Sequence, residues 1–197
     1  MTDKMLEIFK ENGGQMKMSE AVMSGISRYH LSSMVKNGIL EKITRGVYRL
    51  VAAENFSYPD VQLVCSKSSK AVIFLISALV FHRMTTQIQR SVSIAIVERS
   101  RPPIVKGIRL EVHYLKPEIY SAGIEDHTID GVKIKVYDPE KTLVDCFRFR
   151  NKIGLDVAIE ALKYYRERGR MDVNKIHKYA KISRVVKVMQ PYLEAVV

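Results

Sequence analysis

The sequence contains only two cysteines, Cys65 and Cys146, among 197 residues. They lie far apart in apolar or amphipathic stretches, and neither has a second Cys or a His at the spacing of a metal site. We therefore expect two buried free thiols, and we expect the protein to use no metal and no cofactor.

Long hydrophobic runs are also missing. The longest, residues 71–81, is interrupted only by Ser77 and is shorter than the roughly 18 residues that a membrane-spanning helix requires. It predicts a buried helix, and we expect no membrane partner. Residues 1–11 are charged and amphipathic, whereas a secretory signal has a basic start followed by an apolar run. We therefore expect the protein to act in the cytoplasm.

The usual catalytic motifs are absent too. The five histidines show no H-E-x-x-H spacing, and the sequence has no phosphate-binding G-x-x-x-x-G-K-[ST], no G-x-G-x-x-G after a predicted strand and no G-x-S-x-G elbow. Glu125, Asp126 and Asp130 cluster, but around a predicted hairpin turn, where acidic residues are favoured for solvation alone. We expect the protein not to be an enzyme.

Positive charge is abundant. The chain carries 32 Lys and Arg against 21 Asp and Glu, a formal net charge of +11. Its hydrophobic content of 47% is enough for one large domain or for a small module beside a medium one, and we favour two domains. Residues 1–50 contain 8 basic and 5 acidic side chains, and residues 151–197 contain 10 and 5. This excess favours a polyanionic partner, nucleic acid first and an acidic protein second.

The N-terminal residues predict two short helices. Residues 3–11 place apolar side chains along one side of a helix, and Gly13 and Gly14 can end it in a left-handed conformation. Residues 18–23 predict a second helix, with Ser19 as its expected cap.

A third helix is predicted to follow after a tight turn. Ser27 can cap its first turn, Leu31, Met34 and Val35 recur at helical spacing, and Asn37-Gly38 can end it. Three helices in so few residues, with a tight turn before the third, indicate a helix-turn-helix.

A basic hairpin is predicted after the third helix. Residues 39–43 and 47–51 are typical of two strands, and Thr44-Arg45-Gly46 can form the turn between them. A hairpin after a recognition helix is the arrangement of a winged helix-turn-helix.

The outward face of the third helix and the hairpin carry groups that suit DNA. Tyr29, Ser32, Ser33 and Lys36 point away from the apolar side of the helix, and Arg28 and His30 flank them in its first turn. On the hairpin, Lys42, Arg45 and Arg49 supply positive charge suited to phosphates. Small helical domains also expose polar residues without binding DNA, and wings also contact proteins. A single module of modest charge should bind weakly, so we expect self-association on DNA or repeated operator sites.

The rest of the chain predicts a larger domain. Residues 52–60 lose periodicity and end in Tyr-Pro-Asp, which indicates a linker between a domain of residues 1–51 and one of residues 61–197. Strands are predicted at 92–97, 108–115, 125–129 and 132–137, and helices at 61–65, 70–82, 139–149, 155–168, 173–179 and 185–193. The fold class expected is α+β: an N-terminal winged helix-turn-helix followed by a mixed domain with a small sheet and C-terminal helices.

The predicted helix 139–149 has one notable acidic residue just before it and another within it. Asp138 precedes Pro139 and Glu140, which is a common helix start because Asp can cap and Pro fits the first turn. Asp145 falls among apolar residues and, if buried, needs a basic or backbone partner; we favour a structural role over a catalytic one.

The C-terminal helices carry many basic residues. They form either an ordinary solvated surface or a second surface that binds a polyanion. They are Lys163, Arg166, Arg168, Arg170, Lys175, Lys178, Lys181, Arg184 and Lys187.

Three stretches together resemble the AbiEi family of bacterial type IV antitoxins. They are GILEKITRGVYRL (38–50), SALVFHRMT (77–85) and YDPEKTLVDCFR (137–148). The first is shared by many winged-helix regulators, and its combination with the other two is more specific. The resemblance covers nearly the whole chain, although residues 100–107 and the last helices match only loosely.

The resemblance implies a division of labour. The winged helix would bind operator DNA upstream of its own operon and repress that operon. The contacts that the resemblance implies are Arg28, Tyr29, Ser32, Ser33 and Lys36 on the third helix and Lys42, Thr44, Arg45 and Arg49 on the hairpin. The C-terminal domain would counter a co-encoded nucleotidyltransferase toxin without a stable complex, and such systems act in phage abortive infection. Ser77, His82, Asp138, Thr142 and Asp145 match the family pattern, and no chemical role is assigned to them. Two other interpretations stay open: a C-terminal enzyme acting on nucleotides, nucleic acid or the toxin, and a scaffold whose winged helix binds protein.

Overall fold

The computed structural model describes residues 2–51, 57–169 and 171–196. The chain forms two compact units. The first contains residues 1–69 with 103–108 and 126–134, and the second contains residues 70–102, 109–125 and 135–197. Residues 52–56 of the expected linker lie outside the described residues, so the domain boundary at residues 51 and 61 stays a prediction.

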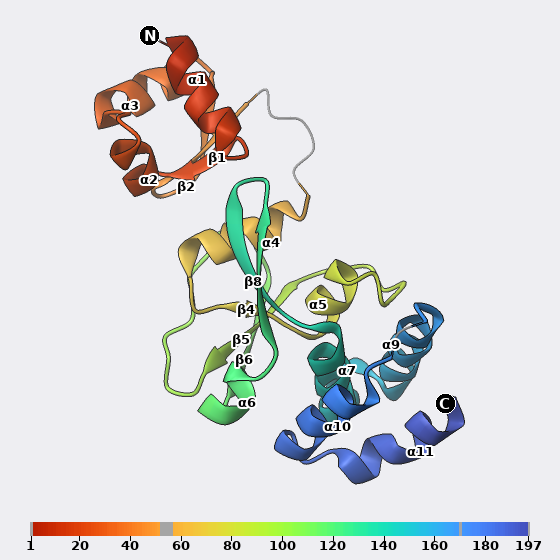
Figure 1. The fold of residues 1–197 in the computed structure, drawn as a ribbon. Helices are drawn as coiled ribbons and strands as arrows, with labels where there is room; N and C mark the ends of the chain where they lie inside the picture. The colour runs from red at the N-terminus through yellow and green to blue at the C-terminus, as the bar shows by residue number, and fades with distance from the viewer. Residues whose placement is uncertain (1, 52–56, 170, 197) are drawn as a thin grey trace. The chain divides into compact units, whose positions relative to one another are not determined.

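The N-terminal residues form helices followed by a hairpin, as the sequence predicts (Figure 1). Their elements are α1 (Thr2–Glu11), β1 (Gln15–Lys17), α2 (Met18–Met23), α3 (Arg28–Lys36), β2 (Leu40–Thr44) and β3 (Val47–Leu50). The strands form an antiparallel sheet in the order β1-β3-β2. Phe9, Ile26, Leu31 and Leu40 are among the buried side chains that join the helices to this sheet.

Two details of this region differ from the prediction. The sequence analysis did not predict strand β1, because a segment of three residues shows little periodicity. Its hydrogen bonds to β3 hold this segment in an extended conformation. The start of α2 is also different: its cap residue is Lys17 rather than Ser19, and the Lys17 backbone N–H donates to Glu20 Oε2 at 2.9 Å. The Glu20 carboxylate therefore satisfies the helix start that we expected Ser19 to cap.

A mixed five-stranded sheet forms the centre of the remaining chain. Its order is β6-β5-β4-β8-β7, with β5 parallel to β6, β4 antiparallel to β5 and β4 parallel to β8. The strands are β4 (Val72–Ile73), β5 (Val92–Val97), β6 (Leu110–Leu115), β7 (Ile124–Ile129) and β8 (Val132–Tyr137). Separate strands and helices of this kind confirm the α+β class.

The prediction of one helix over residues 70–82 is wrong. Residues 72 and 73 form β4, and the helix α5 covers only Leu75–Phe81. Val72 and Ile73 are fully buried and pair with β5 on one side and β8 on the other. Their β-branched side chains suit a central strand, and the pairing of distant segments overrides the helical periodicity of the run.

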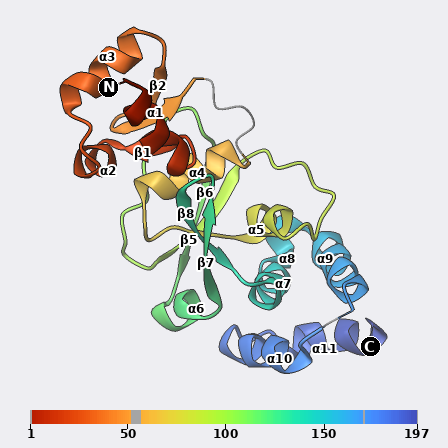
Figure 2. The same ribbon diagram turned by 45° about the horizontal axis from the view of Figure 1, so that its top comes forward.

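Helices pack beside this sheet and against one another. Besides α5 they are α4 (Pro59–Lys67), α6 (Pro117–Ser121), α7 (Pro139–Arg148), α8 (Arg150–Ile153), α9 (Leu155–Glu167), α10 (Val173–Ile182) and α11 (Val186–Val196). In Figures 1 and 2, α7 lies among α9, α10 and α11, and the buried faces of these helices share one core with β4 and α5. The short helices α6 and α8 were not predicted, and α4 begins inside the expected linker.

Both cysteines are buried free thiols, which confirms the prediction. Burial raises the pKa of the Cys146 thiol, so it stays protonated at neutral pH. Among the described residues, no helix is long and apolar enough to cross a membrane.

Candidate functional site

Interactions close in sequence fix where α3 begins and ends and which of its sides is buried. Ser27 Oγ accepts a hydrogen bond from the His30 backbone N–H at 3.2 Å and lies 2.9 Å from His30 Nδ1, so Ser27 caps the helix as predicted. Leu31 and Met34 are buried and hold one side of α3 against the core. Gly38, with φ of 69°, follows the C-terminal cap Asn37. The opposite side of the helix is therefore presented in a fixed orientation.

The outward side of α3 carries polar and aromatic groups at the surface. Arg28, Ser32 and Lys36 are exposed, Ser33 is half-buried, and the Tyr29 side chain is 79% exposed. Exposure of a tyrosine to this degree offers a ring and a hydroxyl to a partner rather than to the core. The structure thus brings the five predicted helix contacts to the surface, and their role in binding stays a prediction.

The four predicted hairpin contacts differ in availability. Lys42 and Arg45 are exposed and Thr44 is half-buried. Arg49 is half-buried, and its Nε and Nη2 donate to Gln15 Oε1 at 2.9 and 2.7 Å. Burial lowers the pKa of Arg49, although it stays a cation. Because Gln15 already accepts from its guanidinium, Arg49 is less available to a phosphate than Lys42 or Arg45.

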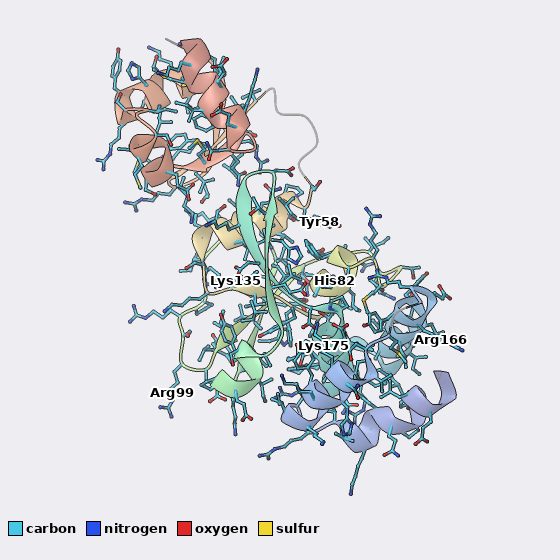
Figure 3. The ribbon with its side chains drawn as sticks, in the orientation of Figure 1. Tyr58, His82, Arg99, Lys135, Arg166 and Lys175 are labelled. Atoms are coloured by element: carbon cyan, nitrogen blue, oxygen red, sulfur yellow. The ribbon has the colours of Figure 1, made fainter. Side chains whose placement is uncertain are left out.

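The motif residues of the second unit are, in contrast, buried or part-buried groups that bond to the backbone and to other side chains. The carbonyl of Tyr137, at the end of β8, accepts from Thr142 Oγ1 at 3.1 Å and lies 2.7 Å from His82 Nε2. His82 ends α5 (Figure 3) and Thr142 belongs to the first turn of α7, so this carbonyl joins two helices to the sheet. Ser77 Oγ accepts from the Ser93 N–H at 2.8 Å and fastens α5 to β5.

Asp138 caps α7, as the sequence predicts, and also receives side chains from a distant helix. Its Oδ1 accepts from the Lys141 N–H at 2.7 Å, and its Oδ2 accepts from the Tyr179 hydroxyl at 2.7 Å. Lys175 Nζ lies 3.2 Å from the same Oδ2. Burial raises the pKa of Asp138, and these hydrogen bonds and the Lys175 charge oppose that rise.

Gly123 permits this cap. Its φ is 76°, and a Cβ at this position would lie 2.7 Å from Lys141 Cβ and 2.9 Å from Asp138 Oδ2. Its carbonyl also accepts from the Asp138 N–H at 2.7 Å. A side chain at residue 123 would therefore push the start of α7 away from the segment that precedes β7.

Asp145 has the basic partner that the sequence analysis required. Its carboxylate pairs with Lys141 Nζ one turn earlier, and both side chains have no exposed surface. Burial raises the pKa of Asp145 while the Lys141 ammonium group opposes the rise. The same ammonium group lies 4.5 Å from the centre of the Tyr137 ring. Both charges are closed off from solvent, which is the arrangement that we expect of a structural ion pair.

Lys175 does not belong to the basic outer surface to which the sequence analysis assigned it. Its side chain is 35% exposed and points toward α7 (Figure 3), where Nζ lies 3.0 Å from Glu140 Oε2 in addition to Asp138. Tyr165 of α9 donates a hydrogen bond to the other Glu140 oxygen. Burial and this bond raise the pKa of Tyr165 to about 12.

We name the group Asp138, Glu140, Lys141, Asp145, Tyr165, Lys175 and Tyr179 the α7 polar cluster. The sequence analysis did not identify Lys141, Tyr165, Lys175 and Tyr179 as members. A usable signal was the spacing of Lys175 and Tyr179, which lie four residues apart on one helix face. Among the described residues, no group of three or more His, Cys, Asp or Glu side chains is placed to hold a metal ion.

The N-terminal residues match a known family. A family model described as a transcriptional regulator, AbiEi antitoxin, matches residues 3–51. These residues contain α3 and the hairpin, whereas the stretches 77–85 and 137–148 lie outside the match. No curated protein sequence matches the chain.

Proposed function

We propose that α2, α3 and the β2–β3 hairpin form a winged helix-turn-helix that binds operator DNA and represses the protein's own operon. The match of residues 3–51 to a family model described as a transcriptional regulator, AbiEi antitoxin, supports this proposal. The observation that carries the proposal is the exposed polar side of α3, opposite buried Leu31 and Met34, within the matched residues.

The exposed groups divide into two roles by chemistry. Arg28, Tyr29 and Ser32 lie in the first half of α3, the part of a recognition helix that meets base edges in the major groove. Ser33 and Lys36 follow and reach bases or phosphates. On the hairpin, Lys42, Thr44 and Arg45 suit the phosphate backbone, with Arg49 as a secondary contact. We expect repeated operator sites or self-association on DNA, because one such module offers few phosphate contacts.

Substitution on α3 tests the DNA-binding half. Arg28→Ala should weaken binding to DNA from directly upstream of the gene by about 1–3 kcal/mol if Arg28 contacts a base, and Lys36→Ala should reduce the salt slope by about 1 if Lys36 contacts a phosphate. Lys10→Ala removes an exposed cation of α1 and is the matched control. Equal binding by Arg28→Ala, Lys36→Ala and Lys10→Ala would refute the assignment of α3.

We propose that residues 61–197 supply the antitoxin activity and counter a co-encoded nucleotidyltransferase toxin in the cytoplasm. The pair would be a type IV system, which needs no stable complex, and would act in phage abortive infection. The description of the matched family as an antitoxin supports the general role. The complete burial of Asp145 and its pairing with Lys141 support a regulator rather than an enzyme built on that residue.

A full-length variant that has lost DNA binding tests whether toxin neutralisation is independent of operator repression. A variant with both Arg28→Ala and Lys36→Ala, expressed from an unrelated promoter, should still protect cells that express the toxin, although it no longer represses its own operon. Loss of protection in that variant, at a normal protein level, would show that neutralisation requires DNA binding and would refute the proposed division.

A further inference from the structure

The turn of the β2–β3 hairpin is bonded to two segments outside the hairpin. The Gly46 carbonyl accepts a hydrogen bond from the Met18 N–H, at the start of α2, at 2.9 Å. The preceding carbonyl, that of Arg45, accepts a hydrogen bond from Nζ of Lys67, the last residue of α4. A hairpin tip usually lies at the surface, where water satisfies its carbonyls. Here one of the two donors comes from outside residues 3–51, which the family model matches.

Helix α4 holds Lys67 in a defined position. Residues 61–66 of this helix are buried, and Lys67 itself is half-buried. Gln62 Nε2 donates to Asp130 Oδ2 at 2.7 Å, and the Ser57 N–H donates to the same oxygen at 2.9 Å. All these residues belong to the first compact unit, together with the hairpin. The hairpin turn is therefore bonded to a side chain that a packed helix carries.

The contact also brings positive charges together. Burial lowers the pKa of Lys67, and the charges of Arg45 and Lys17 lower it further. Repulsion of this kind opposes the contact, and the hydrogen bond from the ammonium group to the Arg45 carbonyl compensates for it. An anion that approaches the hairpin would relieve the repulsion, so the contact and the binding of a phosphate at the hairpin should favour one another.

A bond to the Arg45 carbonyl restricts the peptide plane between Arg45 and Gly46, because the peptide unit turns as one rigid group. The direction of the exposed Arg45 side chain depends on that backbone. We propose that Lys67 is a positioning residue of the hairpin, which fixes the turn in the conformation that contacts the phosphate backbone of DNA. This inference rests on the proposed function of the hairpin, and it adds α4 to a DNA-binding part that the sequence analysis ended at residue 51.

Trypsin gives a test that needs no DNA. It cleaves after exposed Arg and Lys residues, and the bond from Arg45 to Gly46 contains the carbonyl that Lys67 holds. A turn that is held in place is cleaved more slowly than one that opens freely. In the folded full chain, Lys67→Met should raise the initial rate of cleavage at this bond by about threefold or more, followed by mass spectrometry. Lys67→Arg keeps a charged donor and should stay near the unaltered protein.

A matched variant controls for the lost charge. Lys133→Met removes an exposed cation of the same compact unit and should leave the cleavage rate after Arg45 unchanged. Equal cleavage rates in Lys67→Met and Lys133→Met would overturn the proposal.

Binding to the upstream DNA tests whether Lys67 acts through the hairpin. Lys67→Met alone should lower the affinity by a factor of about 3 to 10, the size expected for one lost hydrogen bond. The same substitution is then made in a variant with Lys42→Ala and Arg45→Ala, whose hairpin lacks these two cations. In that background it should cause no further loss and no change in the salt slope, because the contacts that Lys67 positions are already gone.

The remaining outcomes separate the two proposals. A full further loss in the variant without hairpin cations, with a salt slope shallower by about 0.9, would make Lys67 a phosphate contact itself and would overturn the positioning role. Unchanged affinity in Lys67→Met alone would overturn it too. Equal binding of the unaltered protein to the upstream DNA and to an unrelated duplex would instead contradict the proposed function, and with it a role of Lys67 in operator binding. Faster cleavage of Lys67→Met would then still show that Lys67 holds the turn.

Discussion

Polar side chains gather in two places in this molecule, on α3 and around the start of α7, and they differ in exposure. On α3, Arg28, Ser32 and Lys36 face solvent and lie opposite a buried apolar side. In the α7 polar cluster, Lys141 and Asp145 have no exposed surface. Similar residue types therefore serve two purposes, and burial distinguishes them: the first group is available to a partner, whereas the second is used in holding helices to the sheet.

The comparison also separates two kinds of sequence motif. The stretch 38–50 contains surface groups suited to binding, and it lies within the segment that the family model matches. The stretches 77–85 and 137–148 contain Ser77, His82 and Thr142, whose side chains bond to the backbone of other elements. Those bonds give Ser77, His82 and Thr142 structural partners.

Removal of one partner of the buried pair should have the largest effect. Asp145→Ala leaves the Lys141 ammonium group buried without its counter-charge, and we expect it to lower the free energy of unfolding by about 3–5 kcal/mol, measured by urea denaturation. Replacement of both residues, Lys141→Met with Asp145→Leu, should recover most of the loss. A loss of about 1 kcal/mol or less in Asp145→Ala would mean that water reaches the pair in solution.

A comparison of two helix caps should give the next largest difference. Asp138 and Asp172 each accept from the backbone N–H three residues later, at 2.7 and 2.9 Å, but Asp138 is buried and also accepts from Tyr179. We expect Asp138→Ala to cost roughly 2–4 kcal/mol and Asp172→Ala about 1 kcal/mol in thermal or urea denaturation. Equal losses would show that the bonds to α10 add nothing to the cap.

Acid should weaken the α7 polar cluster through Glu140. Burial opposes ionisation of this residue, but the hydrogen bonds from Tyr165 and Lys175 outweigh it and lower the pKa of Glu140 below its usual value of 4.5. A group with a lowered folded pKa stabilises the fold above its unfolded pKa, and this contribution is lost as the pH falls through the folded value.

Glu140→Gln tests this contribution. We expect the variant to lose about 1 kcal/mol of stability at neutral pH, and its stability should fall less steeply than that of the unaltered protein when the pH is lowered through 4.5. Denaturation curves at a series of pH values give both quantities. Parallel pH profiles for the two proteins would contradict a lowered pKa at Glu140.

Substitution on α3 should have the smallest effect on stability. Arg28→Ala with Lys36→Ala removes two exposed side chains, and we expect the free energy of unfolding to change by no more than about 0.5 kcal/mol while operator binding is lost. The same denaturation measurement tests this. A loss beyond about 1 kcal/mol would place these residues in the fold and would remove the contrast with α7.

Local signals made α3 and the hairpin predictable from the sequence. Ser27 caps a helix through a contact three residues away, and Gly38 has the positive φ that often follows a helix end. The cap at Asp138 was predictable for the same reason, and so was the need of Asp145 for a partner. In each case the physical cause lies within one or two turns of chain.

Non-local pairing explains what the sequence did not predict. Val72 and Ile73 sit in an apolar run with helical periodicity, and only β5 and β8, from distant parts of the chain, make them a strand. Lys175 lies 37 residues from Asp138 and follows the same three-residue spacing as the exposed cations after it. No local pattern distinguishes the lysine that turns toward α7 from those that stay in solvent.

The most direct test of the central claim is a mobility-shift titration of the full chain on DNA from directly upstream of its own gene, at two salt concentrations, beside an unrelated duplex. We predict preferential and salt-sensitive shifts in more than one step on the upstream DNA, because α3 reads base edges at repeated sites. Equal and weak binding to both duplexes would contradict the account and would reduce the exposed groups of α3 to ordinary surface polarity.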